Sequence, residues 1–282
     1  IPRIEIPVKA PTISMARHAQ IVASRNQAAD DKEEQDDTQQ KGSSKAESFV
    51  GLKIDASSVP EPKKASPRVT SLPLKFSEGE HVILIRNTLL DYAQFEGFFE
   101  TLLQQRFPSK KLVVRTLAWS ADEVDVQPRP DSFGSLNQHL SVQKADLILA
   151  AYGFNESFAG KNGLEKFHTD LTAFVADLKS KAFNGKSAPQ IVLVSPIANE
   201  NVKGVAAADA NNARIKAYAD VIRDVAAEQK VGFADVFTAT EQALSISGDD
   251  LTINGVHLTE EGYELFAKIL YRGVFGEEPP DV

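Results

Sequence analysis

The alternation of short apolar runs with longer amphipathic segments, from residue 78 onward, most constrains what this chain can fold into. The short runs are of strand length and rich in β-branched residues, and the segments between them have helical spacing. Strands that alternate with helices form a parallel sheet covered on both faces. The expected strands are residues 81–85, 111–115, 145–152, 190–195 and 231–236, and the expected helices are 89–107, 164–181, 207–228 and one ending near 271.

Right-handed crossovers wind such a sheet into a three-layer α/β/α sandwich. Ligands of these folds bind beyond the carboxyl ends of the strands. Polar residues stand at these ends and before the last helix, so the sequence predicts one crevice built from separate stretches. They are Arg86, Asn87 and Thr88 after the first strand, Ser120 and Ala121 after the second, Gly153 and Asn155 after the third, and Asn254 and His257 before the last helix.

The first 77 residues differ in composition from the rest of the chain. Residues 1–25 are expected to form an extended arm, because prolines stand there among β-branched residues. Residues 26–48 are acidic and almost free of apolar side chains, which predicts a flexible linker. Residues 49–77 are proline-rich and are expected to lie irregularly along the domain surface. The folded domain is expected at 78–275, followed by a short tail at 276–282.

Composition excludes several classes of function. The net charge of −8 and the scattered basic residues argue against a nucleic-acid surface, and no apolar run approaches the roughly 18 residues of a membrane span. Cysteine is absent, so thiolate metal sites and a cysteine nucleophile are excluded. His139, His168 and His257 are far apart and lack paired carboxylates, and the turn after the first strand is not glycine-rich. We therefore expect no metal, flavin or dinucleotide cofactor.

Four blocks at the strand ends resemble, in order, those of the SGNH (GDSL-type) hydrolases, a family of esterases, lipases and carbohydrate deacetylases with a flavodoxin-like fold. The resemblance covers residues 78–275. It implies that Thr88 occupies the nucleophile position, His257 the base and Asn254 the residue that orients the base. The blocks are Ile85-Arg86-Asn87-Thr88, Ser120-Ala121-Asp122, Gly153-Phe154-Asn155-Glu156 and Asn254-Gly255-Val256-His257.

The chain departs from the family pattern at these positions. Threonine replaces serine as the hydroxyl, and its extra methyl restricts χ1. Arg86 and Asn87 replace a glycine and an acid. Asn254 can hydrogen-bond the imidazole, but it cannot stabilise an imidazolium by charge and can select the wrong tautomer. In a Ser-His-Asp protease, the same Asp to Asn change lowers kcat by roughly 10⁴.

The resemblance implies that the oxyanion donors survive better. They would be the backbone at Ala121, the Asn155 side chain and the Gly153 turn. A carboxylate from Asp91, Asp122, Glu123 or Glu156 could replace the missing orienting acid, and spacing does not decide among them. Ser195 is interpreted as a turn residue rather than a nucleophile. Trp119, beside the donor block, fits either a lid over the core or a platform for a sugar.

Three interpretations of function remain open. The first is a degenerate SGNH-like pseudoenzyme with weak or absent hydrolysis that acts as a binding or structural module. The second is an active esterase that cleaves a small ester or an acetylated carbohydrate with Thr88 as nucleophile. The third is an unrelated flavodoxin-like binder. The same motifs are similar to those of SGNH-like domains in large multidomain bacterial envelope proteins, which implies a secreted or periplasmic location and other modules as partners.

Overall fold

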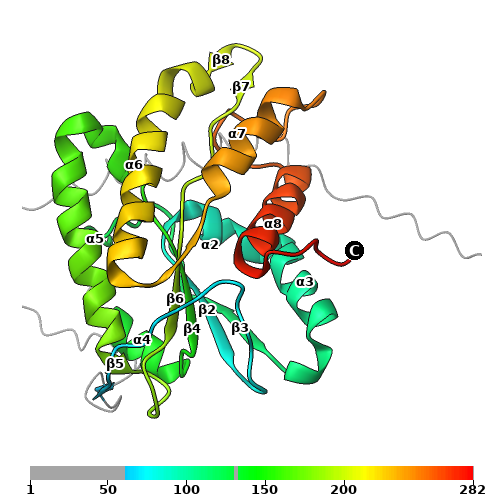
Figure 1. Cartoon of the computed structure of the whole chain (residues 1–282). Coiled ribbons are helices and arrows are strands. Elements are labelled where there is room, and N and C mark those ends of the chain that lie inside the picture. The colour runs from blue at the N-terminus through cyan, green and yellow to red at the C-terminus, as the bar shows by residue number, and fades with distance from the viewer. Residues whose placement is uncertain (1–60, 130–132, 282) are drawn as a thin grey trace, which may run out of the picture. The chain divides into compact units, whose positions relative to one another are not determined.

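A parallel five-stranded sheet lies at the centre of the computed structural model, which describes residues 61–129 and 133–281 (Figure 1). The spatial order of the strands is β3-β2-β4-β6-β9, and each pairs in parallel with its neighbours. The α/β/α sandwich expected from the sequence is confirmed. The bounds are β2 His81–Ile85, β3 Val113–Thr116, β4 Leu147–Ala151, β6 Gln190–Val194 and β9 Gly232–Ala234.

Helices cover both faces of this sheet, and strand residues alternate between the two cores they create. Val82 and Leu84 of β2 face one core, whereas Ile83 and Ile85 face the other. The first core is closed by α2, α3 and α8, and the second by α4, α5 and α6, with α5 and α6 side by side (Figure 1). The helices are α2 Asn87–Glu96, α3 Phe98–Arg106, α4 Leu136–Val142, α5 Leu164–Lys179, α6 Ala207–Gln229, α7 Val236–Ile246 and α8 Glu260–Phe275.

The structure corrects the expected helix at 89–107. Gly97, with φ 68°, caps α2 in the left-handed region, and α3 starts at the next residue. The bend leaves two aromatic side chains outside the core, since Tyr92 and Phe95 are 48% and 73% exposed. Two aromatic residues of the expected helix therefore do not belong to the core.

Two further helices were not expected. No helix was expected between β3 and β4, but Ser135 forms a capping box with Gln138 and starts α4. The last strand ends at Ala234, before the expected residue 236, because Asp235 caps α7 by accepting from the Thr238 N–H. At both places a local cap outweighs the apolar pattern.

Residues 61–77 lie along the domain with little regular structure. The short strand β1 (Lys63–Lys64) pairs with β5 (Lys181–Ala182), and the Thr70 hydroxyl accepts from the Ile191 N–H at 2.9 Å. Leu74 and Phe76 are buried in the core under α8. The expected arm at 1–25, the linker at 26–48 and residues 49–60 lie outside the described residues.

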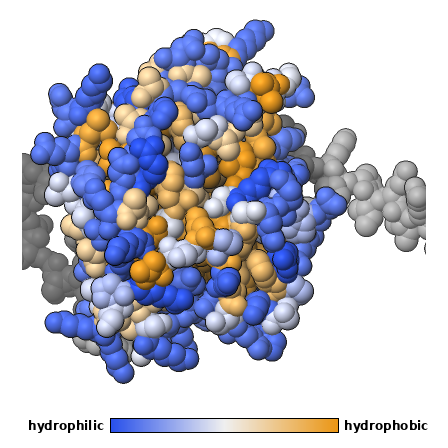
Figure 2. Space-filling model, viewed as in Figure 1, coloured by the Kyte–Doolittle hydropathy of each residue, from blue (hydrophilic) through white to orange (hydrophobic). Residues whose placement is uncertain are grey.

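The surface of the described part is mixed in character. On the face shown in Figure 2, hydrophobic residues reach the surface in separate patches between hydrophilic ones. Within residues 61–129 and 133–281, no helix is long and apolar enough to cross a bilayer. The remaining short elements are the 3₁₀ helices η2 (Pro108–Lys110) and η3 (Glu156–Gly163) and the hairpin strands β7 (Asn201–Val202) and β8 (Val205–Ala206).

Candidate functional site

Thr88 lies in the first turn of α2, directly beyond the carboxyl end of β2. Its half-buried hydroxyl accepts a hydrogen bond from the Ala121 N–H at 3.3 Å. Ala121 has φ 66°, a left-handed conformation that turns this N–H toward Thr88. The first two sequence blocks thus meet across the ends of neighbouring strands.

The backbone before Thr88 is strained. Arg86 has φ 70° and ψ 156°, a region that is essentially restricted to glycine, and Asn87 has φ 46°. Such a conformation costs of order 1–3 kcal/mol and persists only when surrounding contacts enforce it. Here Arg86 Nε donates to the Tyr152 hydroxyl at 2.8 Å, and the guanidinium lies 5.2 Å from the Phe174 ring centroid. The buried arginine side chain thereby holds a turn that normally requires glycine.

His257 is exposed, and its ring is fixed by Asn254. Asn254 Oδ1 lies 3.1 Å from His257 Nδ1 and also accepts from the N–H groups of Val256 and His257 at 3.2 and 3.0 Å. Because two backbone N–H groups donate to this atom, it must be the amide oxygen and not the nitrogen. His257 Nδ1 must then carry the proton, and Nε2 is left as the acceptor. The expected risk of a wrong tautomer is not realised.

A buried carboxylate, Glu200, holds the loop that carries His257. It accepts from the N–H groups of Leu251 and Thr252 and from the Thr252 hydroxyl, the last at 2.6 Å. The Glu200 N–H donates to the carbonyl of Gly255, and the Gly255 N–H donates to Thr252 Oγ1. The sequence analysis missed Glu200, and its only signal was a charged residue close after a buried strand.

The predicted oxyanion donors are in different states. The half-buried Asn155 side chain has no hydrogen-bond partner among the described residues, so its amide is available to a ligand. The Gly153 N–H, in contrast, donates to Glu156 Oε2 at 2.9 Å. Gly153 has φ 96° and shapes the turn that presents Asn155.

These groups line one cavity of about 230 Å³. Thr88, Ala121, Asn155 and His257 all contribute to its wall, so four stretches far apart in sequence do converge. No direct hydrogen bond joins Thr88 to His257 in the part of the chain that the structure describes. The apolar part of the wall, which the sequence did not single out, consists of Leu89, Phe154, Pro196, Ile197, Val256, Leu258 and Tyr263.

None of the candidate carboxylates contacts the His257 ring. Asp122 is paired with Arg86 and Arg129. Asp91 accepts from the Ser120 N–H and hydroxyl at 2.9 and 2.6 Å. Glu156 accepts from the Gly153 and Val124 N–H groups, and burial raises its pKa to about 7. These three acids therefore support the surrounding loops, and among the described residues the His257 ring is oriented by the Asn254 amide.

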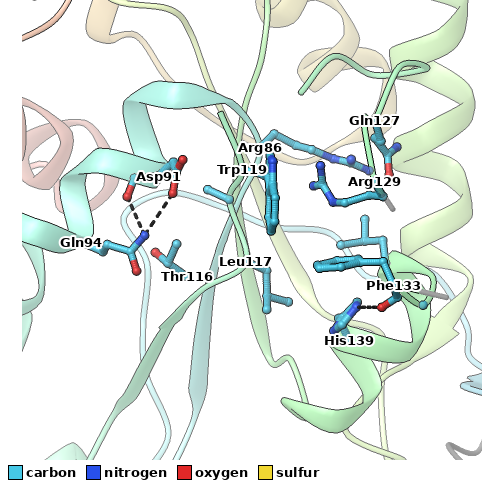
Figure 3. Close-up of a pocket in the computed structure, with 13 residues that line it drawn as sticks. Arg86, Asp91, Gln94, Thr116, Leu117, Trp119, Gln127, Arg129, Phe133 and His139 are labelled. Carbon is cyan, nitrogen blue, oxygen red and sulfur yellow. Dashed lines mark hydrogen bonds between the residues drawn. The ribbon is translucent and has the colours of Figure 1, made fainter. Parts of the chain in front are cut away.

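Some predicted crevice residues face away from this cavity. Arg86 and Trp119 line a second cavity, shown in Figure 3, and neither of them lines the Thr88 cavity, so Arg86 does not block Thr88. Ser195 is buried, and its hydroxyl accepts from the Val236 and Phe237 N–H groups, in keeping with a structural role. His139 contacts the Phe133 carbonyl, and His168 contacts Glu228. Within the described ranges no group of three metal-binding side chains occurs.

The chemistry of acyl transfer needs a hydroxyl, an imidazole acceptor and oxyanion donors around one reacting carbon. The cavity contains all of these types of group. It lacks the carboxylate that would stabilise a protonated imidazole.

Comparison with solved structures finds the same fold in esterases. An acetylxylan esterase from Geobacillus stearothermophilus, in a catalytic mutant form, matches with a TM-score of 0.58 and 19% identity over 74% of this chain and 100% of that one. The wild-type form of that enzyme matches with a TM-score of 0.55 and 18% identity over 71% of this chain and 96% of that one. An α/β hydrolase from the metagenome of Lake Arreo, Spain, matches with a TM-score of 0.52, 16% identity and the same coverage of 71% and 96%.

Comparison with curated proteins finds no match. The family comparison is decisive, because the GDSL-like lipase/acylhydrolase family matches residues 88–265, more than half of the chain and the stretch from Thr88 past His257. The chain therefore belongs to the GDSL-like lipase/acylhydrolase family.

Proposed function

We propose that the cavity between Thr88 and His257 binds an acylated ligand, most simply an acetylated carbohydrate, and hydrolyses it slowly. The observation that carries this proposal is the hydrogen bond from His257 Nδ1 to an amide oxygen where the family has a carboxylate. The amide keeps Nε2 in the acceptor form but cannot stabilise the imidazolium that forms during attack. The site therefore keeps the groups that would bind and orient the ligand, but it lacks the negative charge beside His257.

The ligand class is supported by the cavity and by the fold. A volume of about 230 Å³ with apolar walls and a free Asn155 amide suits a small acyl group with a carbonyl to be polarised. The solved structures with the same fold include an acetylxylan esterase. A short acyl chain on a sugar hydroxyl fits both observations.

Slow hydrolysis would follow the ordinary acyl-transfer route. The Thr88 hydroxyl attacks the acyl carbon while His257 Nε2 takes its proton, and the oxyanion receives hydrogen bonds from the Ala121 N–H and the Asn155 amide. The alcohol leaves with the proton from the imidazolium, and water then cleaves the acyl-threonine by the same steps. The free Nε2 of His257 favours an esterase over a purely structural module.

Two measurements test the proposal. Calorimetric titration of the full chain with acetylated and deacetylated xylo-oligosaccharides should show binding of the acetylated form only. Hydrolysis of p-nitrophenyl acetate should be slow, and Thr88→Ala and His257→Ala should each reduce it to background. Binding that ignores the acetyl groups would overturn the ligand class. A turnover near the ~10 s⁻¹ typical of enzymes would overturn slow hydrolysis.

A further inference from the structure

Figure 3 shows the residues that line a second cavity, of about 300 Å³. It has no lining residue in common with the Thr88 cavity, but some residues of the two linings are neighbours in sequence. Arg86 lines the second cavity while Asn87 and Thr88 line the first, and Trp119 lines the second while Ala121 lines the first. The segments after β2 and β3 thus contribute to both cavities.

Two arginines meet one carboxylate at one end of this cavity. Asp122 is 1% exposed and accepts from both Arg86 and Arg129, the latter through two hydrogen bonds at 2.6 and 2.7 Å. Among the described residues, two guanidinium groups thus share the Asp122 carboxylate. Arg129 Nε has no partner among the described residues. The other acid in the wall, Asp91, is turned to the Ser120 N–H and hydroxyl, with Trp119 between it and the arginines (Figure 3).

The walls next to the Arg129 guanidinium are flat and aromatic. The Arg129 guanidinium stacks at 4.6 Å from the Trp119 ring centroid and 5.3 Å from that of Phe133. Trp119 remains 42% exposed. Gln127 also lines the cavity, and its side-chain amide has no partner in the described part of the chain. Aromatic side chains offer apolar surface to the flat face of a sugar ring, and a free amide offers hydrogen bonds to hydroxyls.

We infer that this cavity is a subsite for an acidic sugar residue, a ring that carries a single carboxylate. The Arg129 Nε is a charged hydrogen-bond donor without a partner among the described residues, and a planar guanidinium suits a carboxylate. The inference rests on the proposed function. It extends the ligand from one acylated sugar in the Thr88 cavity to an oligosaccharide whose neighbouring unit is a uronate.

The test is titration of the full chain with an oligogalacturonate and with a neutral xylo-oligosaccharide of equal length. The acidic ligand should bind more tightly, and its affinity should fall as salt rises. Arg129→Gln should weaken binding of the acidic ligand by about tenfold or more, since a charged hydrogen bond is lost. Arg223→Gln, on the exposed face of α6, removes the same charge elsewhere and should leave the affinity unchanged.

A second variant guards against misfolding, because Arg129 also neutralises buried Asp122. Trp119→Leu keeps all the charges and should weaken the acidic ligand by removing the ring platform. Equal affinity for the acidic and neutral ligands, or no binding of either, would overturn the inference. So would full displacement of the sugar by inorganic phosphate, which would indicate an anion site alone.

Failure here is distinguishable from failure of the proposed function. Arg129 and Trp119 do not line the Thr88 cavity. Hydrolysis of p-nitrophenyl acetate by the unaltered chain tests the Thr88 cavity alone, because this ester is too small to reach the second cavity, and its outcome does not depend on whether the acidic ligand binds.

Discussion

At the scale of single residues, the site keeps its geometry and changes its electrostatics. Asn254 accepts three hydrogen bonds through one oxygen, and an aspartate could accept the same three without moving the loop. Thr88 still meets the Ala121 N–H at 3.3 Å. The substitutions at Thr88 and Asn254 therefore leave the backbone around both residues able to present them.

Asn254→Asp is expected to increase the rate of p-nitrophenyl acetate hydrolysis. The loss of roughly 10⁴ in a protease includes a wrong tautomer, and His257 already has the right one, so the gain should lie between about tenfold and 10⁴. Asn162→Asp, an exposed change in η3, is the matched control for charge. An unchanged rate would show that charge at Asn254 is not what limits hydrolysis.

Arg86→Gly and Arg86→Ala separate backbone strain from side-chain contacts. Both lose the contacts to Tyr152 and Asp122, but only glycine relaxes at φ 70° and ψ 156°. After allowing for the greater unfolded entropy of glycine, the glycine variant should be the more stable by about 1 kcal/mol. Urea unfolding followed by circular dichroism measures the difference. Equal stabilities of the two variants would contradict backbone strain at Arg86.

The blocks at the strand ends could be predicted from sequence because residue type and order suffice to identify them. Which carboxylate serves which loop could not be predicted. The roles of Asp122 and Glu156 depend on Arg86 and Val124, which lie 36 and 32 residues away in sequence, and spacing carries no such information. Glu200 was missed for the same reason, since its partners are about fifty residues away in sequence.

At the scale of elements, the loop before α8 depends on Glu200, which follows β6 in the chain. The helix itself starts with the Thr259 hydroxyl accepting from the Gly262 N–H at 3.1 Å. The strands were also predicted well, because buried β-branched runs are unambiguous in an α/β chain. The ends of elements were predicted less well, because single caps at Gly97 and Asp235 decide them.

Glu200→Ala should destabilise the fold and loosen His257. It leaves three donors of the loop without their acceptor, which costs on the order of 3 kcal/mol once water has replaced part of the loss. Chemical denaturation gives the loss in free energy of unfolding. Glu241→Ala, on the exposed side of α7, should cost little by comparison, and a similar loss in both variants would contradict the role of Glu200.

At the scale of the whole molecule, two cores on either side of one sheet bring the loops together at a single edge. The α/β/α arrangement follows from the sequence, and the family match supports it. A secreted or periplasmic location and partner modules in a longer polypeptide stay predictions.

The stability of the molecule should fall as pH rises through the range in which Glu156 titrates. Burial raises its pKa from 4.5 to about 7, so the folded state binds a proton that the unfolded state releases. The free energy of unfolding then decreases between about pH 4.5 and 7, by at most about 1.4 kcal/mol per pH unit, and levels off above. Glu156→Gln should remove this slope in unfolding curves taken from pH 4 to 8. A slope that persists in the variant would assign it to other groups.

The contacts that hold the His257 loop also protect it chemically. Asn254 is followed by Gly255, the dipeptide most prone to lose ammonia when the glycine nitrogen attacks the side-chain amide. Here the Gly255 N–H donates a hydrogen bond to Thr252 Oγ1, and Gly255 is packed against Glu200 and Ala207. Storage at alkaline pH should therefore deamidate Glu200→Ala faster than the wild type, as measured by peptide mass mapping. Where the product is aspartate, ageing would supply the carboxylate that the family normally encodes.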